Sequence, residues 1–239
     1  MLRLMKLEMK KFKLGWYVRR AIIANIAILA LMIFTSIVAQ VEGDPEIRDP
    51  QMMLLTASTL VRATFIIFGS VLIARLIIGE YKNKTILLMF SYPINRKKMM
   101  ISKLVITATL TFITVIVSNI LVVGVFFGID SYFSILPNPF TVEQLTQEGI
   151  KLVPLAIATA GISLIPIYFG MRKRSVPATI VSSLIVVSIA MNTNPAFSTA
   201  TFLPLQLALA AIGVVIAYYG IKNIEKEDIT VYVRFVTTL

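Results

Sequence analysis

This chain contains no cysteine and no histidine. It can therefore form no disulfide bond, and it offers neither thiolate nor imidazole ligands for a zinc site. The lack of histidine also excludes the side chain that enzymes most often use as a general base. Ser118 and Ser182 lie in apolar stretches with no base beside them, so the sequence does not favour a membrane-embedded hydrolase.

Charged residues are scarce, at 15% of the 239 residues, whereas 57% of the residues are hydrophobic and the mean hydropathy is +0.86. Soluble domains are about 25% charged, and a soluble fold could not bury so much apolar surface. The surrounding solvent is therefore expected to be lipid. The net charge of +11 does not indicate a nucleic-acid partner, because the excess lies in short clusters beside apolar stretches, where it sets orientation and meets anionic headgroups.

Six apolar stretches approach the roughly 20 residues that a helix needs to cross a bilayer. We expect membrane spans at residues 21–41, 58–78, 104–127, 152–169, 176–191 and 203–221, of which the fifth is the shortest. The first stretch is expected to remain as a mature helix, because no small-residue cleavage site follows it. Gly161 and Gly170 are expected to allow close approach between helices.

The connections between these stretches alternate in charge. Nineteen Lys and Arg fall in residues 1–20, 79–103, 170–175 and 222–239, whereas the connections of the other side hold two, Arg48 and Lys151. Lys and Arg accumulate on the cytoplasmic side of membrane proteins. We therefore predict that both termini are cytoplasmic.

The two ends of the chain carry weaker signals. Residues 1–20 are basic and amphipathic, which indicates either a helix in the inner membrane interface, with Trp16 and Tyr17 at headgroup depth, or a simple basic flank. Residues 222–239 are expected to form a cytoplasmic tail. Within this tail, residues 231–235 alternate in the manner of a strand, with no function that we can assign.

The most informative connection is at residues 80–103, EYKNKTILLMFSYPINRKKMMISK. It is longer than two antiparallel helices require, and its centre, residues 85–90, is apolar although the connection is basic. Apolar patches exposed to solvent usually mark docking sites. We predict a short helix that places an apolar ridge in a groove of a partner protein. The alternative is a helix that only rests on lipid.

This segment resembles the first cytoplasmic loop of ABC exporter permeases of the second exporter class, the bacitracin and lantibiotic type of transport permease. That loop has an acidic residue, a Thr-x-x-x-Leu run, a Pro, a basic residue and a Lys at the next helix. The matching positions here are Glu80, Thr85, Leu88 or Met89, Pro93, Arg96 and Lys103. Glu8 and Lys11 near the N-terminus also match. The chain departs from the pattern at Asn83 and Lys84, where a Gly often precedes the Thr, and in its compact last outer loop.

The resemblance implies an all-α integral membrane permease, a single domain over residues 1–239 with six transmembrane helices, in the plasma membrane of a bacterium. It implies no ATPase and no cofactor in this chain, and the sequence contains no Gly-x-x-x-x-Gly-Lys phosphate loop. ATP and Mg²⁺ would be bound by partner ABC ATPase subunits, and a second permease subunit, identical or different, would complete the pathway. The implied ATPase-coupling residues are Glu80, Thr85, Leu88, Met89, Phe90, Tyr92, Pro93 and Arg96. The implied substrates are amphiphiles such as peptide antibiotics, exported for resistance or immunity.

Two arginines lie inside the second expected span. Charges in a span are costly and often functional. Arg62 and Arg75 are each about one turn from an expected end, so both are able to snorkel to the headgroups. The alternatives are a substrate contact for Arg62 and an ion pair with Glu80 for Arg75.

Two other functions remain open at this point. An ion-coupled secondary transporter usually places Asp, Glu or His at membrane depth, and none lies within the six expected spans. No internal repeat is visible either. A membrane anchor or sensor subunit that transports nothing would fit the docking connection equally well.

Overall fold

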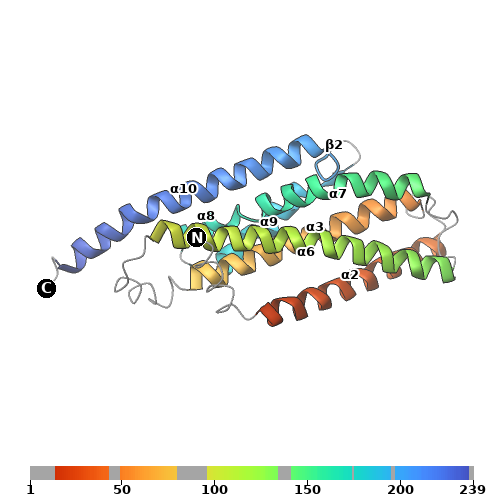
Figure 1. Ribbon diagram of the computed structural model, residues 1–239, viewed down its shortest axis with the longest axis horizontal. Helices are drawn as coiled ribbons and strands as arrows, with labels where there is room; N and C mark the ends of the chain where they lie inside the picture. The colour runs from red at the N-terminus through yellow and green to blue at the C-terminus, as the bar shows by residue number, and fades with distance from the viewer. Residues whose placement is uncertain are drawn as a thin grey trace.

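The computed structural model describes residues 14–42, 49–79, 96–133, 141–173, 175–194 and 197–236. The described chain is almost entirely helical and forms an elongated bundle whose long helices run close to its long axis (Figure 1). The elements in chain order are α2 (Leu14–Glu42), α3 (Pro50–Ile73), the π-helix η1 (Ala74–Ile78), α6 (Arg96–Phe133), α7 (Val142–Ile162), α8 (Pro166–Lys173), α9 (Val176–Ala190), β1 (Thr193–Asn194), β2 (Phe197–Ser198) and α10 (Leu203–Val236). The two strands pair antiparallel.

Five helical segments of the described chain are long and apolar enough to cross a membrane: Gly15–Val41, Pro50–Ile78, Lys98–Phe133, Val142–Lys173 and Leu203–Gly220. They contain the first four expected spans, and the last of them matches the sixth expected span to within one residue. The fifth expected span is α9, which has 15 residues. At 1.5 Å per residue this helix is about 22 Å long, shorter than the roughly 30 Å of a hydrocarbon core.

Local sequence sets the helix boundaries. The Asp49 side chain accepts a hydrogen bond from the backbone N–H of Gln51, and Pro50 follows at a position where a missing N–H costs nothing. At the start of α7, Gln144 Oε1 accepts a hydrogen bond from the backbone N–H of Thr141. The break between α7 and α8 precedes Pro166, which cannot donate to the preceding turn.

Both ends of the chain differ from expectation. The expected interfacial segment does not end at residue 20, because residues 14–20 already belong to α2. Tyr17 is 1% exposed, its hydroxyl lies 3.1 Å from Thr114 Oγ1, and its ring meets Phe68 edge-on. Tyr17 is therefore packed inside the bundle, and its position at headgroup depth stays a prediction. Residues 231–235 are helical, as part of α10, and do not form a strand.

Glycine residues allow several of the helices to pack closely. A Cβ on Gly161 of α7 would lie 2.6 Å from the Ala210 Cβ of α10, and one on Gly213 would collide with the Gly161 carbonyl. A Cβ on Gly170 would likewise collide with Thr179, so the predicted close approaches at Gly161 and Gly170 are confirmed.

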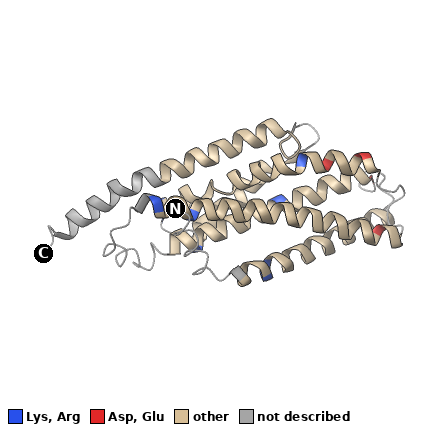
Figure 2. Ribbon diagram, in the orientation of Figure 1, with Lys and Arg blue, Asp and Glu red and all other residues tan. Residues whose placement is uncertain are grey.

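Charge is distributed unequally along the bundle (Figure 2). We call the end where α2 and α6 begin and η1 ends the basic end, and the end where α2 and α6 end and α3 and α7 begin the acidic end. Among the side chains that the structure describes, every carboxylate lies toward the acidic end: Asp49, Asp130, Glu143 and Glu148. This separation supports the predicted orientation, with the basic end cytoplasmic.

Candidate functional site

Most of the residues expected to couple to an ATPase fall outside the described part of the chain. These are Glu80, Thr85, Leu88, Met89, Phe90, Tyr92 and Pro93. Arg96 begins α6, but its side chain is not among those described. The coupling helix therefore stays a prediction, and the structure informs on the residues that flank it.

The chain reaches this connection through the π-helix η1. A π-helix widens the helical turn, and such turns are frequent at functional sites. The Lys103 ammonium of α6 is 1% exposed and donates a hydrogen bond to the Leu76 carbonyl of η1, 2.9 Å away. Sequence reasoning placed Lys103 in the basic connection and missed that its charge is buried. This bond ties the last helical turn before the connection to an early turn after it.

Arg75 lies on the exposed side of η1 and packs on an aromatic ring. Its guanidinium carbon is 3.7 Å from the centroid of the Trp16 ring of α2, and that of Arg20 is 4.1 Å from it. Such cation–π contacts contribute about 0.5–1 kcal/mol at exposed sites. The predicted partner Glu80 lies outside the described residues. Together with the Lys103 bond, these contacts join α2, η1 and α6 at the base of the connection.

Arg62 is directed into the protein. It lies near the middle of α3, is 1% exposed, and donates from Nη2 to the Ala200 carbonyl (3.1 Å) and from Nε to the Ser58 carbonyl (3.2 Å). The snorkelling interpretation of Arg62 is therefore wrong. Ala200 belongs to the connection between α9 and α10, so Arg62 anchors a distant segment against α3.

Part of that connection is buried against the bundle. Thr199 and Ala200 are buried, and the fully buried Gln206 donates from Nε2 to the carbonyls of Ala190 and Thr199. Non-helical backbone is tolerated at membrane depth only where protein groups or water satisfy it. Arg62 and Gln206 supply such groups. Two features of the sequence could have indicated this buried connection: the shortness of the fifth apolar stretch, and the polar residues Arg62 and Gln206 within the second and sixth stretches.

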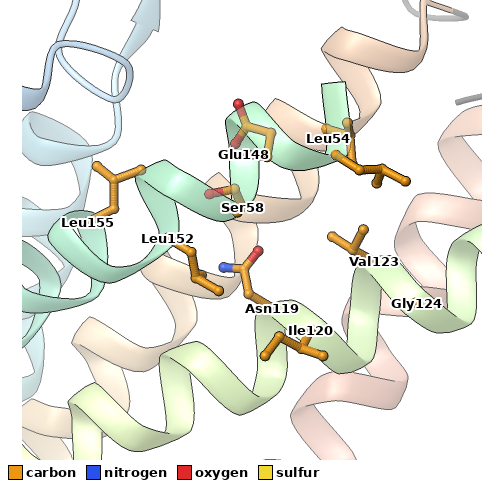
Figure 3. A pocket seen from close by; sticks show the side chains of 11 residues that line it. Leu54, Ser58, Asn119, Ile120, Val123, Gly124, Glu148, Leu152 and Leu155 are labelled. Carbon is orange, nitrogen blue, oxygen red and sulfur yellow. The ribbon is translucent and has the colours of Figure 1, made fainter. Parts of the chain in front are cut away.

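A pocket of about 240 Å³ opens between α3, α6 and α7 in the acidic half of the bundle (Figure 3). Asn119 extends from α6 into the space between α3 and α7, where Ser58 and Glu148 also border the pocket, and the remaining walls are mostly apolar. Asn119 is 7% exposed, and its Nδ2 has no hydrogen-bond partner among the described residues. Sequence reasoning missed Asn119.

A second, more polar pocket of about 370 Å³ lies beside the first. It is bordered by Asp49, which caps α3, by Glu148 and Lys151 of α7, and by Thr201 of the α9–α10 connection. Glu148 borders both pockets, and its Oε1 lies 3.3 Å from Lys151 Nζ. Within the described ranges, no cluster of three or more acidic, histidine or cysteine residues is placed to hold a metal ion. The arrangement is suited to binding a ligand that has both polar and apolar parts.

Comparison with known proteins adds to this picture. The family model described as ABC-2 family transporter protein matches residues 4–189, a range that includes the whole 80–103 connection. The relative named Uncharacterized protein YcbO, from Bacillus subtilis (strain 168), is 44% identical over 227 residues, which cover 95% of this chain and 100% of that protein. No solved structure matches the chain.

Proposed function

This chain belongs to the ABC-2 family of transporter proteins, whose members are membrane permeases that work with an ATPase subunit, and from that premise we propose that it exports an amphiphilic substrate. The substrate class is that of peptide antibiotics, and the role is resistance or self-immunity. The chain contributes one half of the pathway, and a second permease subunit contributes the other. Both termini face the cytoplasm, and the host is a bacterium, as the Bacillus relative supports.

The family match carries the proposal, and the structure at the basic end supports it. The 80–95 segment joins η1 to α6, and both flanks are tied to the bundle by the Lys103 bond to Leu76 and by the Arg75 contact with Trp16. A partner that pushes on the segment would therefore move α3, α6 and α2 together. A segment joined to the bundle by loose ends would dissipate that displacement.

In this mechanism, closure of the ATP-bound ATPase subunits displaces a coupling helix within residues 80–103. Met89 and Phe90 provide its apolar ridge, and Glu80 lies at its hinge. The displacement moves α2, α3 and α6 together relative to the second permease half, and so switches the pathway between the two halves. No group of this chain needs to react chemically for this to occur.

Co-purification tests the docking step. Replacing Met89 and Phe90 together with Asp should abolish recovery of the ATPase with the affinity-tagged permease, because it buries two charges in the interface. The matched control replaces Tyr132 and Phe133 with Asp at the acidic end, where both side chains are exposed, and it should retain the ATPase. Full ATPase recovery with the first variant would contradict the docking role.

Reconstitution tests the function itself. The permease and its ATPase in the same proteoliposomes should move bacitracin or a lantibiotic only when ATP is supplied. Movement driven by an ion gradient without ATP would instead identify a secondary transporter. Stable assembly with the ATPase, but no movement of any amphiphile tested, would identify an anchor or sensor subunit.

A further inference from the structure

We propose that the two adjoining pockets at the acidic end form one binding site for a cationic amphiphile, with its apolar chain in the first pocket and its amine in the second. The inference rests on the proposed function and names the substrate chemistry more closely: a primary amine or similar cation attached to an apolar chain. Its residues are Asn119, Glu148, Leu152 and Asp49.

The shape of the site matches a molecule with two unlike parts. The first pocket, of about 240 Å³, has largely apolar walls, whereas the second, of about 370 Å³, has three charged side chains on its border. Glu148 borders both, so a ligand can pass from one pocket to the other beside a single carboxylate. Ligands bind best where apolar walls surround a few well-placed polar groups.

The position of the site in the bundle also matches the placement of an amphiphile in a bilayer. Ile120, on the wall of the first pocket, is 62% exposed on the outer surface of α6. The pocket therefore opens sideways, toward the surrounding hydrocarbon, while Asp49 caps α3 at the acidic end of the bundle. An amphiphile in one leaflet has the same arrangement, with its chain at depth and its head near the water.

The charges favour a cation. Asp49 and Glu148 bring two carboxylates to the border of the second pocket, against the one ammonium of Lys151 there. The Arg62 guanidinium also interacts electrostatically with Glu148, but it is 1% exposed and borders neither pocket. The Lys151 side chain is 52% exposed, whereas that of Glu148 is 29% exposed, so the carboxylate is the more enclosed of the two groups. An anionic head would meet both carboxylates, whereas an amine would be attracted by them.

Asn119 adds a polar contact in the interior of the first pocket. It is 7% exposed, and leaving its Nδ2 unpaired is costly in an apolar environment. Figure 3 shows its amide directed between α3 and α7, toward Ser58. A carbonyl or hydroxyl group next to the ligand's apolar chain would accept a hydrogen bond from Asn119 Nδ2. Acylated and peptide-like amphiphiles carry such groups.

Photolabelling tests this site on the full chain in phosphatidylcholine nanodiscs. The probe is decylamine with a diazirine in the middle of its chain, and the labelled residues are mapped by mass spectrometry. Labels should concentrate on residues 145–155 of α7 and 119–124 of α6, and excess decylamine should remove them, whereas decanoate and butylamine should not. Labels spread evenly over the lipid-facing helices, or equal competition by decanoate, would overturn the proposal and indicate only partition among bilayer lipids.

Paired variants locate the contribution of each residue. Glu148→Gln should lower competable labelling by about tenfold, the usual effect of losing a hydrogen bond to a charged group, while Glu143→Gln, which borders neither pocket, should not. Leu152→Trp fills the first pocket and should also lower labelling, whereas Ile157→Trp, exposed on the same helix, should not. Equal labelling of all four variants would refute the site.

The outcome can be separated from that of the proposed function, because labelling requires neither ATP nor the ATPase. If labelling fails while ATP-driven export persists, the site is wrong and the function stands. If labelling succeeds but no ATPase assembles with the permease, the site stands and the proposed function fails.

Discussion

Arg62 lies near the middle of a membrane-spanning helix, yet its guanidinium donates to a carbonyl of the α9–α10 connection. Lys103 makes the equivalent contact at the other end, from α6 to the π-helix η1. In both cases a buried cation donates to a backbone carbonyl outside regular α-helix, where a polar group left unpaired would be costly. These two side chains hold the irregular parts of the bundle in place.

Replacing Arg62 with Met should lower the free energy of unfolding by about 1–3 kcal/mol, because the Ala200 carbonyl loses its donor. The measurement is the unfolding transition of the purified protein in detergent, and Arg172→Met, on the exposed side of α8, is the control. Unchanged stability with reduced transport would instead mean that Arg62 contacts substrate.

Replacing Lys103 with Met should weaken the link between ATP hydrolysis and transport, because it frees the Leu76 carbonyl at the base of the connection. We expect the amount of substrate moved per ATP hydrolysed to fall roughly tenfold, which corresponds to a typical coupling free energy between sites. The ATPase should remain bound. Lys98→Met, which alters an exposed side chain of the same helix, is the control. Equal coupling in both variants would remove Lys103 from the mechanism.

At the scale of elements, the close crossing of α7 and α10 and the break before α8 determine how the fourth and sixth spans pack. Gly161 and Gly213 bring the two backbones together, and α8 then turns its Gly170 toward α9 and η1. In lipid there is no hydrophobic force between helices, so their association relies on close van der Waals packing. Glycine at the crossing allows the two backbones to approach closely enough for that packing. The α9–α10 connection is positioned by its contacts with α3 and by this crossing.

Gly161→Ala should therefore destabilise the protein by about 1–3 kcal/mol, the usual cost of overpacking. The added Cβ would meet the backbone and Cβ of Ala210, which cannot move aside as a flexible side chain does. Gly220→Ala, in α10 with open space around it, is the matched control. Thermal unfolding of the two variants side by side gives the answer, and identical transitions would show that the crossing tolerates a methyl group.

At the scale of the whole molecule, the separation of charge along the bundle predicts its orientation. The chain has no cysteine, so single cysteines can be introduced without background. Cysteines at Asp44 and Ser134 should react with an impermeant maleimide added outside intact cells, whereas those at Lys84 and Lys173 should react only after permeabilisation. The reverse pattern would place the basic end outside and invalidate the proposed ATPase contact.

Hydropathy was sufficient to locate the five long apolar helices and the shorter α9, because each is an apolar stretch bounded by polar residues. Hydropathy could not reveal the π-helix, the buried Lys103 or the inward direction of Arg62, since a single sequence does not show which face of a helix meets a neighbour. Asn119 was missed for the same reason, because one amide in an apolar stretch resembles ordinary packing. The coupling connection remains a prediction from its motif.

The shortness of α9 also affects the lipid around the protein. Val181, Leu184, Ile185 and Ile189 of α9 are exposed. As the predicted fifth span, this helix of about 22 Å is expected to meet a hydrocarbon layer of roughly 30 Å directly. Such a hydrophobic mismatch is relieved when the bilayer thins locally. Lipids with shorter acyl chains should therefore be enriched among those that co-purify with the protein. On this flank the headgroups of one leaflet would descend toward the buried connection, shortening the path that an amphiphile travels to leave the membrane.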